Sequence, residues 1–271
     1  MKETVLPQKQ SSGGGKQEGI RTGNGAGTGF LNRDVIKLIA MGTMLLNHLC
    51  HLLGMEGTWL GETMVEIGYF TAITMCFFMV EGYRYTRSKG QYAMRLFGVA
   101  ILSQLPYNVV LSEDGGLFSY TQFNMLFSLF LCFLVLLVKD KVKNIFLKAV
   151  LIFLIIAVSI FTDWAIFAPV FTLLFAVAGD SRKKKIIAYG ISIILFTIIN
   201  VMMTFSSVAM PISLYSVLLG VLAMSFSGVC VLLLYNGKRI EKGKDFFKWF
   251  FYLFYPGHLF VLMLIRWFVL K

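Results

Sequence analysis

Long runs of apolar residues recur along almost the whole chain after Phe30, and this recurrence limits the possible folds more than any other feature. A transmembrane helix needs about 20 mostly apolar residues to cross a hydrocarbon core about 30 Å thick. A spanning β-barrel would instead show weak alternating segments of about ten residues. With 57% hydrophobic residues, the chain is too apolar for a water-soluble domain. The sequence therefore predicts an all-α, polytopic transmembrane helical bundle.

Charged breaks divide the apolar sequence into about nine candidate spans. The runs are 35–53, 64–82, 93–111, 122–138, 145–161, 164–178, 186–204, 213–234 and 246–268. The segment 205–234 could also hide a re-entrant turn or a tenth helix, and Pro211 is the expected break in it. We therefore expect one membrane domain over residues 31–271.

Residues 1–30 differ sharply from this domain, because they are rich in Gly, Gln, Thr and Lys. Such a segment cannot bury enough apolar surface to fold, so we expect a flexible polar tail. A cleaved signal peptide would place a short apolar segment near the N-terminus, and none is expected here.

Basic residues concentrate in alternate connections between the candidate spans. All but Arg266 and Lys271 of the 25 basic residues lie in the segments 1–37, 84–95, 139–148, 182–185 and 238–248. Cytoplasmic loops carry an excess of Lys and Arg, so the pattern predicts a cytoplasmic N-terminus and an external C-terminus. The net charge of +11 is then explained by orientation and by contact with the anionic headgroups of a lipid bilayer. No nucleic-acid partner is expected.

The four cysteines are scattered through apolar runs without a CxxC spacing: Cys50, Cys76, Cys132 and Cys230. We interpret them as packing residues rather than as disulfide or metal ligands, and we expect no metal site.

The first polar cluster inside an apolar run is Asn47, His48 and His51, in the sequence MGTMLLNHLCHL. Ionisable residues inside a span are costly and usually face the bundle interior. An imidazole with a pKa near 6.5 can take a proton from an incoming nucleophile, so His48 is a candidate general base. The alternative is a neutral histidine that forms a hydrogen bond between helices.

A second cluster follows at the inner end of the second span, where Glu81 precedes Arg84, Arg87 and Arg95. Arginines presented together could bind the phosphates of a nucleotide-bearing cofactor by bidentate contacts. The alternative is the ordinary basic charge of an inner loop. Glu81 could pair with an arginine or orient a catalytic group.

Further polar candidates lie near the outer face. Asp163 lies between two spans and could bind a substrate amine or cap the following helix. Glu66 could reach His51, although we expect it to face interfacial water. In the last span, Pro256 loosens the helix next to His258, which lies at a depth similar to that of His48. The two histidines could share a cavity, or His258 could simply bond to a neighbouring helix.

Five segments together resemble the TraX family of integral membrane proteins. They are LIAMGTMLLNHL, MCFFMVEGYRYTRSKGQYAMRLFGVAILSQLPYN, FTDWAIFAPVF, LYNGKR and FFYLFYPGHL, and the resemblance runs from about Leu31 to Arg266. The named activity of that family is acetylation of the N-terminus of conjugative pilin. The resemblance therefore implies a bacterial cytoplasmic-membrane acyltransferase that uses acetyl-CoA as co-substrate.

The resemblance also implies roles for individual residues. His48 matches the family's first-helix histidine, Glu81 its acidic motif, and Arg87 and Arg95 the bases that follow. The other matches are Asp163, before the sixth helix, and Tyr255, Pro256 and His258 in the terminal motif.

The chain departs from the family pattern at two places. The family usually has an Asp before the first-helix histidine and a Gly-Arg opening the second helix, where this chain has Asn47 and Gly68-Tyr69. Asn47 can orient the histidine ring but supplies no charge.

The leading hypothesis is a membrane acyltransferase that moves an acetyl group to an amine or hydroxyl of a peptide or small-molecule acceptor. One alternative is a proton-coupled transporter in which His48, His258 and Glu81 relay protons. Another is a structural membrane protein without activity.

Overall fold

The computed structural model of the protein describes residues 29–112, 114–116, 119, 122–207 and 210–269. Within these residues the chain forms nine α-helices and no β-strand, which confirms the all-helical fold class. The helices are α1 (Arg33–Leu53), α2 (Trp59–Tyr85), α3 (Lys89–Leu111), α4 (Met125–Lys141), α5 (Ile145–Val158), α6 (Phe167–Ala178), α7 (Arg182–Ser207), α8 (Met210–Val229) and α9 (Lys244–Phe268). A 3₁₀ turn, η1 (Ser159–Phe161), follows α5, and a π turn, η2 (Cys230–Leu234), follows α8. Except for residues 29 and 30, the predicted tail lies outside the described residues.

Among the described residues, six helices are long and apolar enough to cross a membrane: α1, α2, α3, α7, α8 with η2, and α9. The α5–η1 segment and α6 are shorter apolar helices. Each helix coincides with one of the nine predicted runs, and the count of nine spans stays a prediction.

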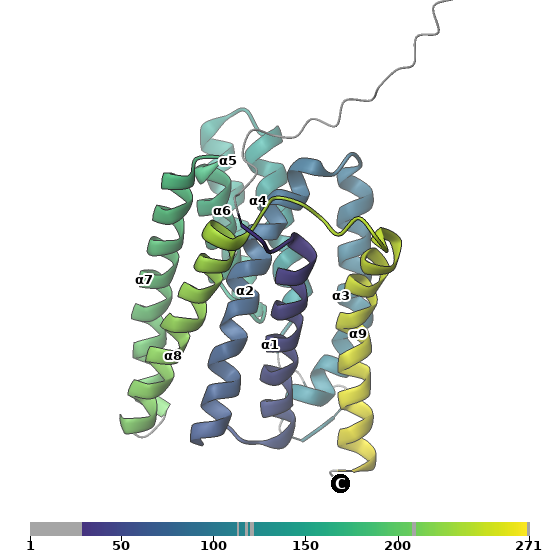
Figure 1. Cartoon of the computed structure of the whole chain (residues 1–271), viewed down its shortest axis with the longest axis vertical. Helices are drawn as coiled ribbons and strands as arrows, with labels where there is room; N and C mark the ends of the chain where they lie inside the picture. Colours follow the sequence, from purple (N-terminus) through teal and green to yellow (C-terminus); the bar gives the residue numbers. More distant parts are fainter. Residues whose placement is uncertain (1–28, 113, 117–118, 120–121, 208–209, 270–271) are drawn as a thin grey trace, which may run out of the picture.

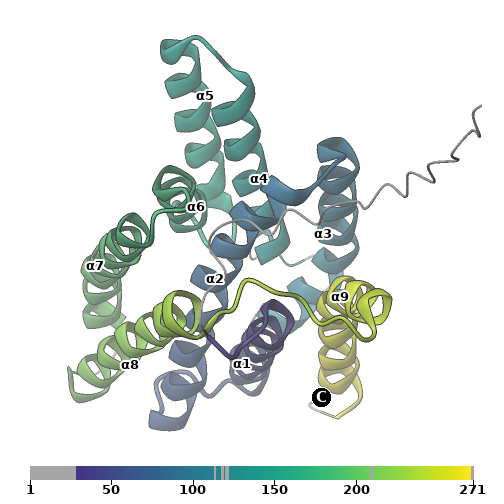
Figure 2. The ribbon, with the colours of Figure 1, turned by 45° about the horizontal axis from the view of Figure 1, so that its top comes forward.

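The central helix is α2, which packs against α1, α8, α6 and α4. Figure 1 shows α7, α8, α2 and α1 side by side, with α3 and α9 paired beyond α1. Figure 2 shows the α4–α5 hairpin projecting from the rest of the bundle. No residue of α5 is buried, so this helix presents apolar side chains in nearly every direction.

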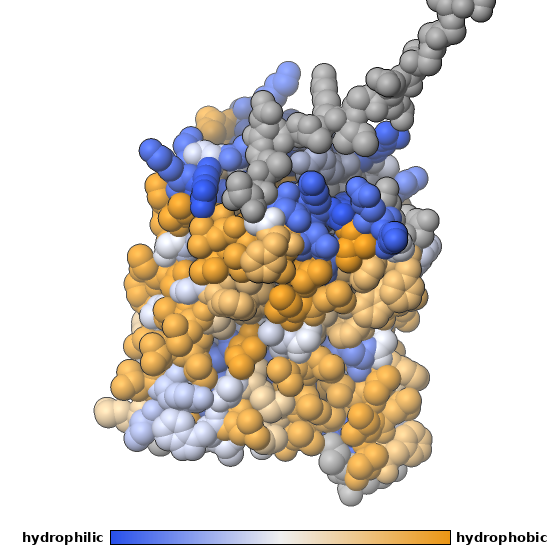
Figure 3. Space-filling view, viewed as in Figure 1, coloured by the Kyte–Doolittle hydropathy of each residue, from blue (hydrophilic) through white to orange (hydrophobic). Residues whose placement is uncertain are grey.

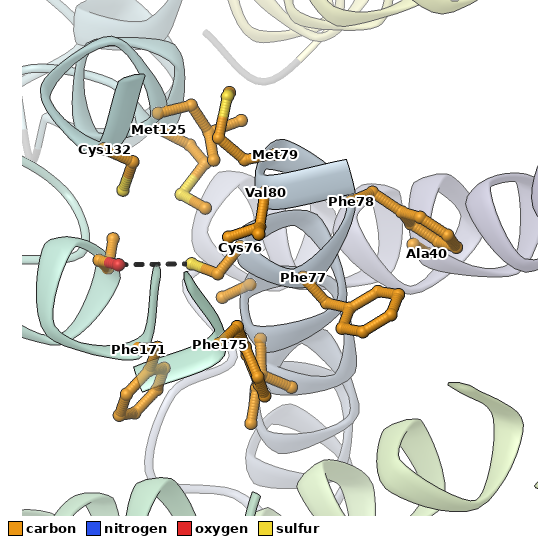
Figure 4. Packing of buried hydrophobic residues seen from close by; sticks show 14 of the residues in the cluster. Ala40, Cys76, Phe77, Phe78, Met79, Val80, Met125, Cys132, Phe171 and Phe175 are labelled. Atoms are coloured by element: carbon orange, nitrogen blue, oxygen red, sulfur yellow. Dashed lines mark hydrogen bonds between the residues drawn. The ribbon is translucent and has the colours of Figure 1, made fainter. Parts of the chain in front are cut away.

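The largest packed cluster surrounds α2, where Cys76 and its neighbours meet α4 and α6 (Figure 4). The Cys76 thiol donates to the Ala168 carbonyl at 3.5 Å. All four cysteines are free and buried, in the packing role expected of them. Because lipid tails are as apolar as these side chains, close packing rather than escape from water holds such helices together.

Hydrophilic residues gather at one end of the molecule, above a broad apolar surface (Figure 3). This end comprises the start of α1 and the α2–α3, α4–α5, α6–α7 and η2–α9 connections, which carry nearly all the basic residues of the described chain. We call it the basic end. The start of α1 is fixed there by the η2–α9 connection, since the Leu31 amide donates to the Leu234 carbonyl at 2.8 Å and the Arg33 amide donates to the Lys238 carbonyl at 2.9 Å.

Pro211 and Pro256 occupy different positions in their helices. Pro211 lies in the first turn of α8, where its missing N–H costs nothing, and α8 then continues to Val229 without a further break in the described residues. The alternative of a tenth helix is therefore wrong for the part of 205–234 that is described. Pro256 lies inside α9, which continues through it to Phe268.

Near the opposite end, Glu66 does not face interfacial water as expected, nor does it contact His51. It is only 2% exposed and lies 2.5 Å from the Ser216 hydroxyl of α8. The same hydroxyl lies 2.8 Å from Glu62, whose other oxygen accepts the Gly57 amide at 2.9 Å. The sequence did not indicate this cluster, because the partner residue lies 150 positions away.

One of the two carboxyl groups in this cluster, that of Glu62 or that of Glu66, must be protonated. Ser216 has one hydroxyl hydrogen and cannot donate to two carboxylates at once. Glu66 is the more deeply buried carboxyl group, 2% exposed against 8% for Glu62, so burial favours the proton on Glu66, and Ser216 donates to Glu62. Glu66 is then the protonated partner, and its carboxyl group donates to the Ser216 oxygen. Burial in an apolar bundle favours this arrangement, in which only one of the two carboxyl groups is charged.

This assignment predicts different outcomes for two conservative substitutions. Glu66→Gln keeps a donor toward Ser216, so we expect almost no change in thermal stability. Glu62→Gln forces the charge onto the more deeply buried Glu66 or leaves Ser216 unsatisfied, at a cost of about 1–3 kcal/mol. Thermal melting of the purified variants in detergent measures both. Equal losses of thermal stability, or a larger loss for Glu66→Gln, would show that the proton is not on Glu66.

Candidate functional site

A cavity of about 290 Å³ lies between α1, α2, the α5–α6 connection and α7. Its wall contains two imidazoles, one carboxyl group and a group of aromatic rings. The lining residues are Met44, Asn47, His48, His51, Val65, Gly68, Tyr69, Thr71, Ala72, Met125, Asp163, Trp164, Phe167 and Phe196.

Helix α1 presents Met44, His48 and His51 to this cavity because residues three or four apart share one helix face. The helix begins at Asn32, whose side chain caps the amides of Asp34 and Val35, and it ends at Gly54 in the left-handed conformation, with φ of 60°. His51, in the last turn, lies 2.7 Å from Glu56, and its side chain is 31% exposed. His48 lies one turn deeper and is only 3% exposed.

The structure brings His48 together with His258 of α9. The Nδ1 atom of His48 lies 2.8 Å from Nε2 of His258, and the two rings are nearly parallel. The Nδ1 atom of His258 lies 2.8 Å from the Phe254 carbonyl. Tyr107 and Tyr255 approach the His48 ring edge-on. Residues that are 210 positions apart therefore form one polar chain inside the bundle.

Asn47 does not orient the His48 ring as expected from the sequence. Its side-chain amide donates to the Val65 carbonyl at 3.2 Å. It also packs directly on Gly68, where a Cβ atom would lie 2.7 Å from the Asn47 Cβ. Asn47 therefore joins α1 to α2, and the ring of His48 is oriented by His258.

Asp163 is held in the cavity wall by an irregular connection between η1 and α6. Its amide donates to the Phe123 carbonyl at 2.7 Å, and its carboxylate accepts from Gln122 at 3.2 Å. Asp163 is outside the helices, and burial raises the pKa of its carboxyl to about 6, while nearby His51 acts in the opposite direction. With this pKa the carboxyl is still mostly ionised at neutral pH, and a bound cation would stabilise the charged form further.

Aromatic rings line the same side of the cavity as Asp163. Trp164 stacks on Phe196 of α7 with centroids 5.7 Å apart, and Tyr69 meets both rings edge-on. Tyr69, which was noted as a departure in the resemblance described above, adds an aromatic ring to this wall. A carboxylate beside aromatic rings is a chemical environment that suits an ammonium group.

The sequence analysis missed Tyr107 and Gln122. Gln122 donates to the Tyr107 hydroxyl at 3.3 Å as well as to Asp163. Tyr107 is fully buried between His48 and Asp163, to which its hydroxyl also hydrogen bonds. The signal in the sequence is the group of polar residues in SQLPYN (103–108) and TQFNML (121–126), before and after the connection between α3 and α4, which can also be interpreted as helix caps. Asn124 caps α4. Its side chain also donates to the Ala100 carbonyl at 2.8 Å, which joins α3 to α4.

Glu81 and the three arginines predicted to lie near it have different partners at the basic end. Glu81 accepts from the Tyr235 hydroxyl at 2.8 Å and lies 3.6 Å from the Arg33 side chain. Arg84 pairs with Asp180, and Arg87 is exposed. The structure therefore does not bring Glu81 to the cavity, and it does not connect Glu81 to the two histidines.

Arg95 belongs to a different cationic group at the basic end. It lies over the Tyr252 ring of α9, 5.8 Å from the centroid. Arg33, Arg95 and Arg239 all lie close enough to Tyr92 to act on its hydroxyl electrostatically. Lys37, one turn beyond Arg33, lies between the rings of Phe78 and Phe251, 5.8 and 5.0 Å from their centroids. These four cations, which we call the α1–α9 cation cluster, come from α1, α3 and the connection before α9.

No group of three or more metal-ligating side chains occurs in the described chain.

Comparison with known proteins gives one family and one curated relative. Residues 32–266 match the model of the TraX protein family. The chain is also 31% identical over 234 residues to a probable fimbrial assembly protein FimC, serogroup H1, from Dichelobacter nodosus, covering 83% of this chain and 91% of that protein. No solved structure matches.

The connection that carries Asp163 contains a strained residue. Ile166 has φ of 57°, a region that β-branched residues avoid, and its amide is held by the Ser159 hydroxyl at 2.9 Å. We expect Ile166→Gly to relieve about 1–3 kcal/mol of strain. The matched control Ile160→Gly removes the same side chain from an exposed position with ordinary φ. Thermal melting should therefore rank Ile166→Gly as the more stable variant, and the opposite ranking would show that the connection is not strained.

Proposed function

This multi-pass membrane protein belongs to the TraX family, and on this basis we propose that it transfers an acetyl group from acetyl-CoA to an amine of an envelope-associated acceptor. The observation that carries the proposal is the cavity in which the imidazole of His48 and the carboxylate of Asp163 line one space. The matched relative is named as a probable fimbrial assembly protein, so a pilus or fimbrial peptide is one acceptor of the right class.

The proposed donor site is the α1–α9 cation cluster. We assign the basic end to the cytoplasm by the positive-inside rule, which places these cations where acetyl-CoA is available. Arg95 and Arg239 are guanidinium groups suited to phosphate, and Lys37 lies deeper in the bundle, whereas Arg33 already pairs with Glu81 and contributes only to the local positive charge. Lys37 and His48 are separated by about 17 Å at 1.5 Å per residue. The pantetheine arm of the donor would follow α1 over this distance.

The proposed acceptor site is the side of the cavity nearer the opposite end. Asp163 would bind the ammonium form of the acceptor, and the rings of Tyr69 and Trp164 would cover it. A hydroxyl acceptor could donate one hydrogen bond to this carboxylate, but it carries no positive charge to interact with the carboxylate or with the rings. The chemistry of the wall therefore favours an amine over the hydroxyl alternative.

The proposed reaction is direct acyl transfer. The ammonium group first gives one proton to solvent water, and the neutral nitrogen then attacks the thioester carbonyl. The new C–N bond forms, the C–S bond breaks, and the second nitrogen proton passes to Nε2 of His48. The departing thiolate takes that proton, which regenerates the neutral imidazole and releases the free thiol. No covalent enzyme intermediate is required.

His48→Asn tests the role of the base. The asparagine amide can still donate toward His258 but offers no basic nitrogen to the cavity. We expect transfer of labelled acetyl from acetyl-CoA to a peptide amine to fall about 10²- to 10⁴-fold in purified membranes. His51→Gln, at the exposed end of the same helix face, should lose much less. Undiminished transfer by His48→Asn would exclude His48 as the base, and substrate uptake driven by a pH gradient without acyl product would favour a transporter.

The donor site is tested by removing single charges. Lys37→Gln and Arg95→Gln each remove one contact to a phosphate, so we expect KM for acetyl-CoA to rise about tenfold or more, with a smaller change in kcat. Arg84→Gln is the matched control, because Arg84 already pairs with Asp180. Steady-state kinetics at varied acetyl-CoA measures these effects. A larger rise in KM for Arg84→Gln than for Lys37→Gln and Arg95→Gln would show that acetyl-CoA binds near Arg84 instead.

A further inference from the structure

The hydrogen bond between His48 and His258 has a definite direction, which follows from the atoms at its two ends. A neutral imidazole has one N–H donor and one acceptor nitrogen. His258 places Nδ1 at 2.8 Å from the Phe254 carbonyl, and a carbonyl can only accept. Nδ1 of His258 therefore carries its hydrogen.

Both rings are buried, with His48 3% and His258 8% exposed, which disfavours a charge on either. Neutral His258 then has a bare Nε2, which must accept the hydrogen bond from Nδ1 of His48 at 2.8 Å. With its hydrogen on Nδ1, His48 has a bare Nε2. The chain runs from His48 through His258 to the Phe254 carbonyl, each group donating to the next.

We propose that His258 is a positioning residue that fixes His48 in the tautomer with a basic Nε2. In this tautomer, the nitrogen not bound to His258 has a lone pair that can receive a proton from an acceptor. With the opposite tautomer, that nitrogen would carry a hydrogen and could not act as a base. The catalytic meaning of this arrangement rests on the proposed function, whereas the tautomer itself follows from the contacts alone.

His258 fixes the tautomer of His48, as the carboxylate does in a Ser-His-Asp triad, but a neutral imidazole adds no negative charge beside the imidazolium. The position next to His48 cannot do so, because Asn47 donates to the Val65 carbonyl instead. When Nε2 of His48 takes the acceptor's proton, its Nδ1–H becomes a stronger donor to His258. The near-parallel rings, 4° apart, keep the donor and the acceptor nitrogen in line during this change.

The edge contacts around the pair support a fixed geometry. Tyr107 and Tyr255 meet the His48 ring at centroid distances of 6.2 and 6.3 Å, and Phe254 stacks on the His258 ring at 4.9 Å. The rings therefore cannot flip without displacing buried aromatic side chains. A ring flip would exchange Nδ1 with Cδ2, and the chain of donors would be lost.

The tautomer can be measured without any activity, because the chain has only three histidines. Nitrogen-15 NMR of protein labelled at histidine distinguishes an N–H nitrogen from a bare one in each ring. His51→Gln and His258→Gln variants assign the signals. We expect Nδ1–H with bare Nε2 in both His48 and His258 near neutral pH. A His48 ring with its hydrogen on Nε2 would overturn the inference, whatever the protein's activity.

Two substitutions of His258 test the positioning role in catalysis. His258→Gln can place an amide oxygen near the position of Nε2 and keep the acceptor for His48, whereas His258→Phe removes it. We expect acetyl transfer by His258→Gln to stay within about tenfold of the wild type, and that of His258→Phe to fall at least about 100-fold. Equal losses in two variants that melt at the wild-type temperature would overturn the positioning role. Absence of transfer by the wild-type protein would instead refute the proposed function and leave the NMR result to stand alone.

Discussion

Hydrocarbon offers no hydrogen bonds, and most of the structure follows from that constraint. Every polar group carried into the bundle must find its partner within the protein. The pairs His48 with His258 and Glu66 with Ser216 satisfy this condition across different helices. At the basic end, Arg33 meets Glu81 for the same reason. Many polar groups of the described chain are therefore joined in local clusters, and the one around His48 lines the cavity of about 290 Å³ that we propose as the reaction site.

The same constraint explains what the sequence could predict. A helix that lies in lipid must form its backbone hydrogen bonds internally and needs apolar side chains, so it appears in the sequence as a long apolar run. All nine helices of the described residues were therefore predicted close to their observed positions. The basic segments were equally readable, because their charges cannot enter the bilayer. Pro211 was correctly placed at a break because its missing N–H fits the start of a helix.

The site was less predictable, because a polar residue in an apolar run reveals that it needs a partner but not which one. His48, Asp163 and His258 were identified as candidates, and the two histidines were expected at a similar depth, but the sequence did not show that His48 would bond His258 or that Asn47 would bond elsewhere. Glu66 and Tyr107 were misjudged or missed, since their partners lie on distant helices. Among the predicted arginines, only Arg95 joins the α1–α9 cation cluster, because a basic loop has the same composition whether its charges bind phosphate, lipid or Asp180.

The central claim is that donor and acceptor reach His48 from opposite ends of one bundle. Reconstitution of the protein in vesicles of known orientation tests it most directly, with acetyl-CoA confined to one side and a membrane-impermeant peptide amine supplied on either side. The account predicts labelled acetyl on the peptide only when acetyl-CoA faces the basic end and the peptide faces the other end. Transfer only when both substrates face the same end would contradict it.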